Sequence, residues 1–201
     1  MTKRKDRRVQ RTEELLRKAL FSLIREHGFE ALTVQDIIDR ANIGRATFYA
    51  HFDNKEDLLL SGFDQLRASL KQRQREAITR GTNIDERVFG FSHEIIAHVH
   101  QHRDLFQAMV GKRSGAVVQN VMHKLLVDLV REDLKAMIVR AEGHPTRTAA
   151  LAEFLAGGLF GMLLWWLSSR TGVSVEDLND LFRRFAIPAV KAQAWLARLQ
   201  D

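Results

Sequence analysis

Four hydrogen-bonding side chains lie close together in the segment RATFYAHF, residues 45–52. They are Arg45, Thr47, Tyr49 and His51. If the segment is a helix, Phe48 and Phe52 are four residues apart and point inward, which leaves the polar side chains toward the outside. Arginine can pair with the edge of a guanine, and hydroxyl groups can donate to phosphate oxygens. The outward face of this segment therefore has the side chains that contact with DNA requires.

Two short helices joined by a tight turn would position these side chains. Thr33 and Asp36 have the capping-box spacing of a helix start, and the apolar residues that follow fall on one helical face. Asn42 tolerates a left-handed backbone and predicts the turn, after which Ile43 is expected in the small core between the helices. The second helix is expected over residues 45–52. Helical hairpins also occur in unrelated all-α proteins, so the pattern alone does not establish DNA binding.

Two longer helices should flank this pair. Residues 12–27 carry apolar side chains at helical spacing, and Gly28 followed by Phe29 predicts the end of that helix. After residue 52, Asp53 is expected to cap a helix with Glu56 at its third position, and this helix should run to about residue 80. Lys55 in its first turn opposes the helix dipole, so we expect Lys55 and the helix N-terminus to face a phosphate together.

The segment from Thr12 to about Leu60 resembles the DNA-binding domain of the TetR family of transcriptional regulators. The resemblance is carried by the Gly28-Phe29 and Leu32-Thr33-Val34 junction, Ile37, Ala41, the Thr47-Phe48-Tyr49 triplet, Phe52, Lys55, Leu58 and Leu59. Two positions depart from the family: Gly44 replaces a side-chain N-cap, and Ala50 is small where the family often has a large or basic residue. The resemblance implies an N-terminal three-helix domain with a helix-turn-helix, followed by a larger helical domain for ligand binding and dimerisation.

The same resemblance implies roles for individual side chains on double-stranded DNA with a palindromic operator. Tyr49, Thr47 and Lys55 would hold phosphates. Gln35 and Arg45 would face base edges, where Gln pairs with adenine and Arg with guanine, while His51 could serve either role. The expected DNA-binding residues are Thr33, Gln35, Arg45, Ala46, Thr47, Tyr49, His51 and Lys55.

Composition agrees with a helical protein of one large or two modest domains. The chain has 201 residues, only two prolines and 45% hydrophobic residues, which predicts an all-α fold. The net charge of +6 favours polyanions, although charge alone does not choose between nucleic acid and an anionic membrane. No cysteine is present, which excludes disulfides and fits a cytoplasmic protein. We expect no secretory signal and no membrane span, because the longest nearly uncharged run, residues 154–167, is too short to cross a bilayer.

The two ends of the chain lead to further expectations. Residues 1–11 carry six cations against Asp6 alone, which predicts a mobile basic arm for phosphate or minor-groove contact. We place the DNA-binding domain at residues 1–60 and the effector-binding and dimerisation domain at residues 61–201. Helices in the second part are expected at about 84–100, 103–110, 115–141, 147–170 and 175–199, with Pro188 inside the last.

One C-terminal helix has the pattern of a subunit interface. It carries Phe154, Gly157, Gly161 and Trp165, and the two glycines have the small-xxx-small spacing that lets helices approach closely. A helix that is apolar nearly all round needs cover on several sides, so one side could face a second copy of the chain. We expect a homodimer formed here. A single helix buried entirely in its own core is the alternative.

Large soft side chains in the same part of the chain predict a pocket for an apolar or aromatic small molecule. They are Phe89, Phe91, Phe106, Met109, Met122 and Phe160. Such residues at helical spacing can equally fill a core. His98 and His102 have the i, i+4 spacing of a metal pair, but two ligands make a weak pattern, and we expect neither a metal nor a cofactor.

The sequence lacks the patterns of the common catalytic sites. It has no cysteine nucleophile, no Gly-x-Ser-x-Gly turn and no Gly-rich phosphate loop, so we expect no enzymatic activity. The sequence instead predicts a DNA-binding transcriptional regulator, most simply a repressor that a small effector releases from its operator. The alternative is a helical protein-interaction or enzymatic domain whose basic surface meets another acidic partner.

Overall fold

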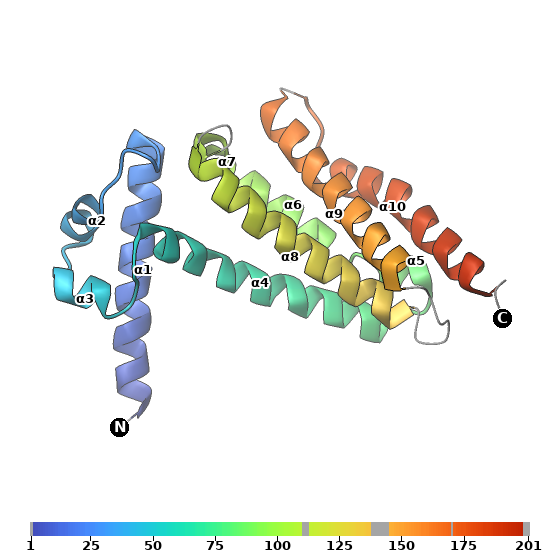
Figure 1. Cartoon of the computed structure of the whole chain (residues 1–201), viewed down its shortest axis with the longest axis horizontal. Helices are drawn as coiled ribbons and strands as arrows, with labels where there is room; N and C mark the ends of the chain where they lie inside the picture. Colours follow the sequence, from blue (N-terminus) through green and yellow to red (C-terminus); the bar gives the residue numbers. More distant parts are fainter. Residues whose placement is uncertain (1, 110–112, 138–144, 170, 199–201) are drawn as a thin grey trace. The chain divides into compact units, whose positions relative to one another are not determined.

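The structure, a computed structural model, describes residues 2–109, 113–137, 145–169 and 171–198 (Figure 1). Within these ranges the chain forms helices and no strand, which confirms the all-α fold. The helices are α1 (Thr2–His27), α2 (Val34–Ala41), α3 (Arg45–Tyr49), α4 (Lys55–Arg80), α5 (Ile84–Arg87), α6 (Ser92–Gln101), α7 (Arg103–Met109), α8 (Arg113–Met137), α9 (Pro145–Ser168) and α10 (Val175–Arg198).

The chain divides into two compact units. The first consists of residues 1–65 and 104–118, and the second of residues 66–103 and 119–201. Helix α4 therefore begins in the first unit and continues in the second. The sequence predicts functional domains at residues 1–60 and 61–201. These two ranges remain a prediction.

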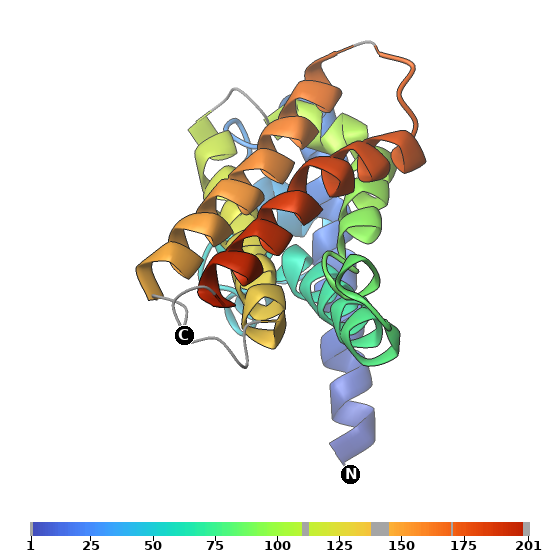
Figure 2. The same ribbon diagram turned by 90° about the vertical axis from the view of Figure 1, so that its right-hand side faces the viewer.

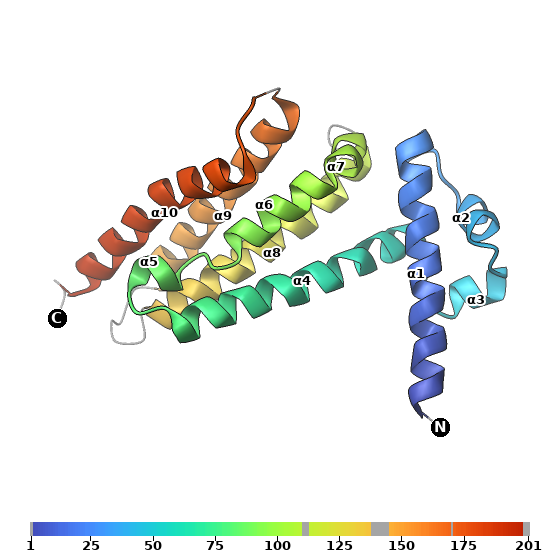
Figure 3. The same ribbon diagram turned by 180° about the vertical axis from the view of Figure 1, so that it is seen from behind.

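The first unit is built around α1, which packs beside α2 and α3 (Figure 3). Leu16, Leu20 and Ile24 of α1 are completely buried, as are Ile37 of α2 and Phe48 of α3. Each of these side chains contributes roughly 1.5–3 kcal/mol by leaving water. Because the apolar face of α3 is fixed in this way, its opposite face is held toward the outside.

The turn between α2 and α3 has the geometry that its residues predict. Thr33 and Asp36 form a reciprocal capping box at the start of α2, and Asn42 is left-handed, with φ 52° and ψ 50°. Gly44 precedes α3 without a side-chain cap. Two details differ from the expectation: Ile43 is half-buried instead of enclosed, and α3 ends at Tyr49, three residues before the predicted end.

Two expectations about helix ends in the first unit are wrong. Residues 2–11 do not form the separate basic arm expected before a helix at residues 12–27, because α1 begins at Thr2. The helix after α3 is capped by Asn54, whose side-chain oxygen accepts from the Asp57 amide at 2.8 Å, while Asp57 accepts from the Asp53 amide at 3.2 Å. The cap thus lies one residue later than the expected pair of Asp53 and Glu56. Asn and Asp are both good N-caps, so type alone could not decide between positions 53 and 54.

In the second unit, α10 packs against α6 and α9 (Figures 1 and 2). Both views show α9 and α10 running side by side. The end of α9 is held by Arg103, whose Nη2 donates to the carbonyls of Trp166, Leu167 and Ser169 at 2.9–3.0 Å. A cation at a helix C-terminus satisfies carbonyls that have no partner within the helix.

The single helix expected over residues 84–100 is in fact two, α5 and α6. The break lies at Phe89, a buried residue with a left-handed backbone at φ 58°. Its amide donates to Asp133 at 2.7 Å, and Arg183 Nη1 donates to its carbonyl at 3.2 Å. Gln74 donates to the other oxygen of Asp133 at 2.8 Å. Side chains from α4, α8 and α10 therefore hold the break, and no local sequence pattern reports such contacts.

The pH dependence of stability should report on Asp133. Burial raises the pKa of this carboxyl to about 7 from an ordinary value of 3.8. Between about pH 4 and pH 7 the folded protein thus holds a proton that the unfolded chain has released, so the free energy of unfolding should fall as pH rises and level off above pH 7. Asp133→Asn should flatten this slope in denaturant titrations between pH 5 and pH 8. A slope that Asp133→Asn leaves unchanged would contradict the assignment.

Candidate nucleic-acid interface

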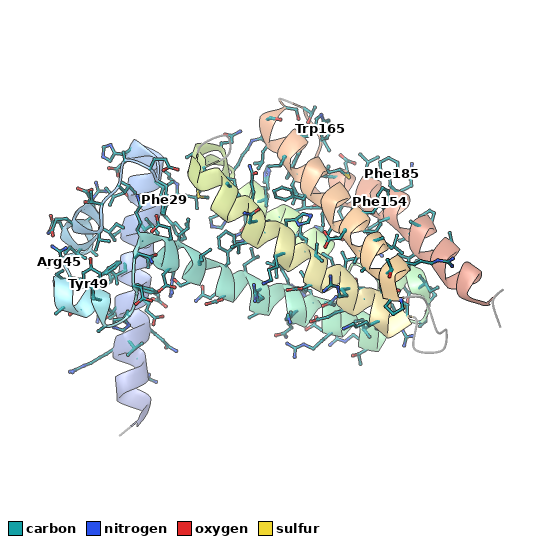
Figure 4. The ribbon with its side chains drawn as sticks, in the orientation of Figure 1. Phe29, Arg45, Tyr49, Phe154, Trp165 and Phe185 are labelled. Atoms are coloured by element: carbon teal, nitrogen blue, oxygen red, sulfur yellow. The ribbon has the colours of Figure 1, made fainter. Side chains whose placement is uncertain are left out.

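Helix α3 has four exposed residues, Arg45, Ala46, Thr47 and Tyr49. Arg45 and Tyr49 lie on the outward face of α3, the side that faces away from α1 (Figure 4). The opposite face of α3 carries Phe48, which is completely buried in the core of the first unit. A rigid apolar anchor on one face and hydrogen-bonding groups on the other is what a helix needs to enter a major groove.

Arg45 and Tyr49 are held together. The Arg45 guanidinium carbon lies 5.8 Å from the centre of the Tyr49 ring, within range of a cation–π interaction. The Tyr49 ring in turn meets the buried Phe48 ring edge-on, with 5.3 Å between the centroids and an angle of 83°. The core thus orients Tyr49, and Tyr49 orients the arginine expected to face base edges.

The polar groups on α2 are engaged within the protein. Gln35 is exposed, and its amide nitrogen donates to Asp39 at 2.8 Å. The Thr33 hydroxyl donates to Asp36 at 2.6 Å and accepts from the Asp36 amide at 3.2 Å. The hydroxyl and the amide of Thr33, which both donate to the Asp36 carboxylate, lower the pKa of Asp36. To pair with an adenine through both its amide oxygen and its amide nitrogen, Gln35 would have to give up its hydrogen bond to Asp39. The Thr33 side chain caps the start of α2.

His51 does not lie on the outward face, as the sequence pattern suggests it should. Its side chain is 15% exposed, and its Nδ1 lies 3.5 Å from Glu13 of α1. It lines a cleft of about 560 Å³. The cleft is lined by Gln10, Glu13, Glu14, Arg17, His51, Phe52, Asp57, Ser61, Asp64 and Gln65. The turn after α3 keeps helical hydrogen bonds, since the Phe52 amide donates to the Phe48 carbonyl at 2.9 Å. At about 100° per residue, His51 therefore lies nearer to the buried Phe48 than to Tyr49. Its DNA contact stays a prediction.

Lys55 holds the connection between α1 and α2. Its ammonium donates to the carbonyls of Phe29 and Leu32 at 3.0 and 2.7 Å, with Glu30 at 3.5 Å. It also lies 4.6 Å from the centre of the Phe29 ring, which Figure 4 labels beside α1. The carbonyls account for a cation in the first turn of α4. Phosphate contact by Lys55 stays a prediction.

Lys55→Met should lower the free energy of unfolding by about 1.5–3 kcal/mol, because a charged donor to several carbonyls is lost. Lys71→Met is the matched control. Lys71 makes an exposed ion pair with Glu132 at 3.0 Å, and such a pair contributes about 0–1 kcal/mol. Urea titration of both variants measures the difference. Equal, small losses in the two variants would show that the carbonyl contacts of Lys55 do not stabilise the fold.

Sequence reasoning missed two ion pairs that brace α1. Arg40 of α2 donates to both oxygens of Glu26, each at 2.7 Å, and these bonds lower the pKa of Glu26 to about 2. Arg25 pairs with Asp104, the second residue of α7. The partners are 14 and 79 residues apart in the chain. No local periodicity relates residues at such separations, so only the fold reveals these pairs.

The residues expected at a subunit interface lie on one exposed stripe of α9. Phe154 is 69% exposed and Trp165 47%. A Cβ atom built on Gly157 or Gly161 would meet nothing within 4 Å. By length and composition, α9 is long and apolar enough to cross a membrane, which differs from the expectation that its apolar run is too short. Less than half of its most apolar part is buried in the single chain. The alternative of a helix buried entirely in its own core therefore does not hold.

The residues expected to line an effector pocket are mostly core residues. Phe89, Phe91, Phe106, Met109 and Met122 are buried, and Phe160 is half-buried. The Phe89 ring meets Phe91 at 6.3 Å between centroids, and the Phe160 ring meets His123 at 6.1 Å. Phe106 and Met109 lie on α7 in the first unit, whereas the other four belong to the second. The set is thus divided between the two units, and the pocket stays a prediction.

The two histidines at the C-terminal end of α6 are close together but are not part of a metal cluster. The rings of His98 and His102 lie 4.4 Å apart, and burial lowers the pKa of His98 to about 4. Among the described residues, no group of three histidine, cysteine, aspartate or glutamate side chains is placed to hold a metal ion.

Comparison with known proteins agrees with the geometry of both units. Residues 16–61 match the family model described as bacterial regulatory proteins of the tetR family, and residues 86–187 match a transcriptional regulator C-terminal region. The chain is 48% identical over 169 residues to the uncharacterized HTH-type transcriptional regulator YxbF of Bacillus subtilis. This match covers 84% of the chain but only 43% of the length of that relative.

Solved structures share the fold over nearly the whole chain. A TetR transcriptional regulator from Streptococcus agalactiae is 26% identical, with a TM-score of 0.63, over 92% of this chain and 99% of that one. Thermus thermophilus FadR, a TetR family repressor in complex with lauroyl-CoA, is 22% identical, with a TM-score of 0.65, over 87% of this chain and 93% of that one. With a helix-turn-helix whose outer face is polar, and with models that match both units, the chain belongs to the TetR family of transcriptional regulators.

Proposed function

We propose that the protein is a homodimeric repressor that binds a two-fold operator through α3 and leaves it when a small apolar or aromatic molecule binds. The observation that carries DNA binding is the outward pair of Arg45 and Tyr49 on a helix whose other face is anchored in the core. The protein would act in the cytoplasm, where the operator is.

On DNA, we assign Arg45 and Gln35 to base edges and Tyr49, Thr47 and Lys55 to phosphates. Arg45 is supported most directly, because the Tyr49 ring holds its guanidinium at the outer side of α3. Ala46 is exposed next to it and offers a methyl group that can contact a thymine methyl. The assignment of Gln35 to a base edge has less support, because its amide nitrogen already donates to Asp39.

Dimerisation would cover the apolar stripe of α9. Phe154 and Trp165 are too large and too exposed to be explained by packing within one chain, and the open space over Gly157 and Gly161 allows a second helix to approach closely. Phe185 on the neighbouring α10 is 65% exposed, which extends the same surface. A four-helix bundle of two α9 and two α10 helices would place the two copies of α3 on one DNA duplex.

Effector release requires a ligand that favours one arrangement of the two subunits over another. A ligand that binds both arrangements equally would not change DNA affinity. The buried phenylalanine and methionine side chains named above support an apolar ligand. The complex of Thermus thermophilus FadR with lauroyl-CoA is consistent with this class, because that molecule carries an apolar acyl chain.

The test is a gel-shift titration of the wild-type protein with genomic fragments, beginning with the region upstream of its own gene. A repressor of this kind should shift a small number of fragments at concentrations that leave the others free. Apolar and aromatic compounds that raise the melting temperature should then displace the bound fragment. Release by hydrophilic ions or metals alone would contradict the effector class, and the absence of any specific shift would contradict operator binding.

A further inference from the structure

Helix α1 extends well beyond the core that it serves. Its first buried core residue is Leu16, yet the helix begins at Thr2. The preceding 14 residues correspond to a length of about 20 Å at 1.5 Å per residue. Figures 1 and 3 show these turns projecting past α3 within the first unit. Among residues 7–15, whose burial the structure describes, no side chain is fully buried, so core packing does not account for an extension of this length.

The exposed side of the extension is basic. Arg7, Arg8 and Arg11 are exposed and fall within a sector of about 100° around the helix axis. Lys18 continues the sector toward the core, with Leu15 beside it at 42% exposure. Among the residues whose side chains the structure describes, these four cations form no ion pair. Glu14 is the one carboxylate at the flank of the sector.

The other side of the same turns is engaged by the protein itself. The Glu13 carboxylate lies 3.6 Å from Nη1 of Arg17 and 3.5 Å from Nδ1 of His51. These three residues and Gln10 line the cleft of about 560 Å³. The carboxylate on this side is therefore already paired. It does not neutralise the arginines that point away from the cleft, so the basic sector is open to an external anion.

Electrostatics within the chain oppose a helix at these residues. The first turn contains no acidic residue, and Lys3, Arg4 and Lys5 lie at the positive end of the helix dipole. Like charges also repeat at helical spacing, as in Arg7 and Arg11 or Arg8 and Arg11, and such pairs destabilise an isolated helix. A row of phosphates would relieve both effects. The helix and a polyanion are therefore expected to stabilise each other.

Double-stranded DNA fits this surface better than an anionic membrane. A membrane-surface helix inserts a row of large apolar side chains between its cations. Between Arg7 and Lys18 the sector has one exposed apolar side chain, Leu15. Val9, on another side of the helix, is half-buried. The extension also belongs to the same compact unit as α3. Arg8 and Lys18 are ten residues, or about 15 Å, apart along the axis. This length matches several phosphates, which follow one another at about 3.4 Å along the axis of each strand.

We propose that the basic sector of α1, formed by Arg7, Arg8, Arg11 and Lys18, is a second DNA-contacting surface that binds phosphates flanking the bases read by α3. It acts as a helix and not as an extended arm. The proposal rests on the DNA binding proposed above and adds a contact that the helix-turn-helix does not supply. It should add affinity and lengthen the protected DNA without adding base preference.

The first experiment compares two triple variants that remove the same charge. One is Arg7→Gln with Arg8→Gln and Arg11→Gln, and the control is Arg80→Gln with Lys124→Gln and Lys135→Gln on exposed positions of the second unit. Affinity for a duplex selected by the wild-type protein is measured from 50 to 300 mM salt, as an assay range. Each lost phosphate contact reduces the slope of log affinity against log salt by about 0.9, so six contacts in a dimer reduce it by about 5.

The control triple should keep the wild-type slope and the full hydroxyl-radical footprint, whereas the α1 triple should lose slope and protection at the outer ends of the site. Identical slopes for the two triples would overturn the proposal. A wild-type protein that binds no duplex would instead overturn the proposed function itself. Sedimentation with vesicles of 30% phosphatidylserine tests whether the basic sector binds an anionic membrane instead. If the wild-type protein binds these vesicles strongly, the α1 triple alone loses that binding, and its DNA affinity is unchanged, the partner of the sector is lipid and the proposal is overturned.

The second experiment tests whether DNA binding requires the helical structure of residues 2–11 or only their positive charge. Val9→Pro keeps every cation, but proline breaks a helix interior, and the break lies before the first core residue, Leu16. The variant should fold and should lose salt slope as the α1 triple does. Hydrogen exchange of residues 3–11 should also slow on DNA in the wild-type protein. A Val9→Pro protein with the full slope and footprint would show that an extended arm suffices and would overturn the helical form.

Discussion

Replacing Gly161 with phenylalanine should give a folded monomer that binds its operator about a hundredfold more weakly than the wild-type protein. A Cβ atom built on Gly161 meets no other atom within 4 Å, so one chain has room for the larger side chain. Glycine is also a poor helix former, so the substitution should not unfold α9. Only a second subunit packed closely on this stripe would be displaced by the ring.

The loss of DNA affinity follows from the loss of bivalency. Two linked reading helices gain about 10²- to 10⁴-fold over one, and a monomer loses this gain without any change in its own DNA contacts. Gly161→Ala is the matched control, because it improves helix propensity with a side chain small enough for a close helix crossing. Analytical ultracentrifugation and an operator titration measure both effects. A folded Gly161→Phe protein that remains a dimer would move the interface away from this part of α9.

Replacing Arg45 with alanine should remove the preference for one base in each half-site, which corresponds to about 1–3 kcal/mol of discrimination. Tyr49→Phe should behave differently. It removes a hydroxyl that we assign to a phosphate but keeps the ring on which the Arg45 guanidinium lies, 5.8 Å from the ring centre. Binding to all sequences should therefore weaken about equally, and the order of preferred bases should stay the same.

A third variant tests the contact between the two side chains. Tyr49→Leu removes the ring as well as the hydroxyl, so Arg45 loses its orientation and base preference should decrease together with affinity. Selection from a random duplex library measures the preference of each variant. If Arg45→Ala selects the same sequences as the wild-type protein with equal stringency, base reading must be assigned to other residues.

Local patterns in the sequence predict the helix-turn-helix well, because each of its features is determined by near neighbours. The capping box of Thr33 and Asp36, the left-handed Asn42 and the buried Phe48 all depend on spacings of a few residues. The missing side-chain cap at Gly44 is equally local. These features place α3 and its outward face without any knowledge of the second unit.

Features that depend on distant partners could not be predicted in this way. The carbonyls that bind Lys55 come from the connection between α1 and α2, and the carboxyl that binds the Phe89 amide comes from α8. Residues 2–11 are a further case, because their charge pattern is typical of a solvated arm although they continue α1. His51 shows that alternating polar residues do not share one helical face, because a position two residues after Tyr49 turns toward the side of the buried Phe48.

The most direct measurement of operator binding is selection of duplexes from a random library by the wild-type protein, followed by a footprint on the selected site. A dimer that reads DNA through α3 should select a two-fold sequence with half-site centres one helical turn, about 34 Å, apart. Arg45 should place a guanine in each half-site, and protection should be symmetric about the centre. Recovery of unrelated sequences with no common half-site, or binding to a single unpaired half-site, would contradict a two-fold regulator that reads DNA through α3.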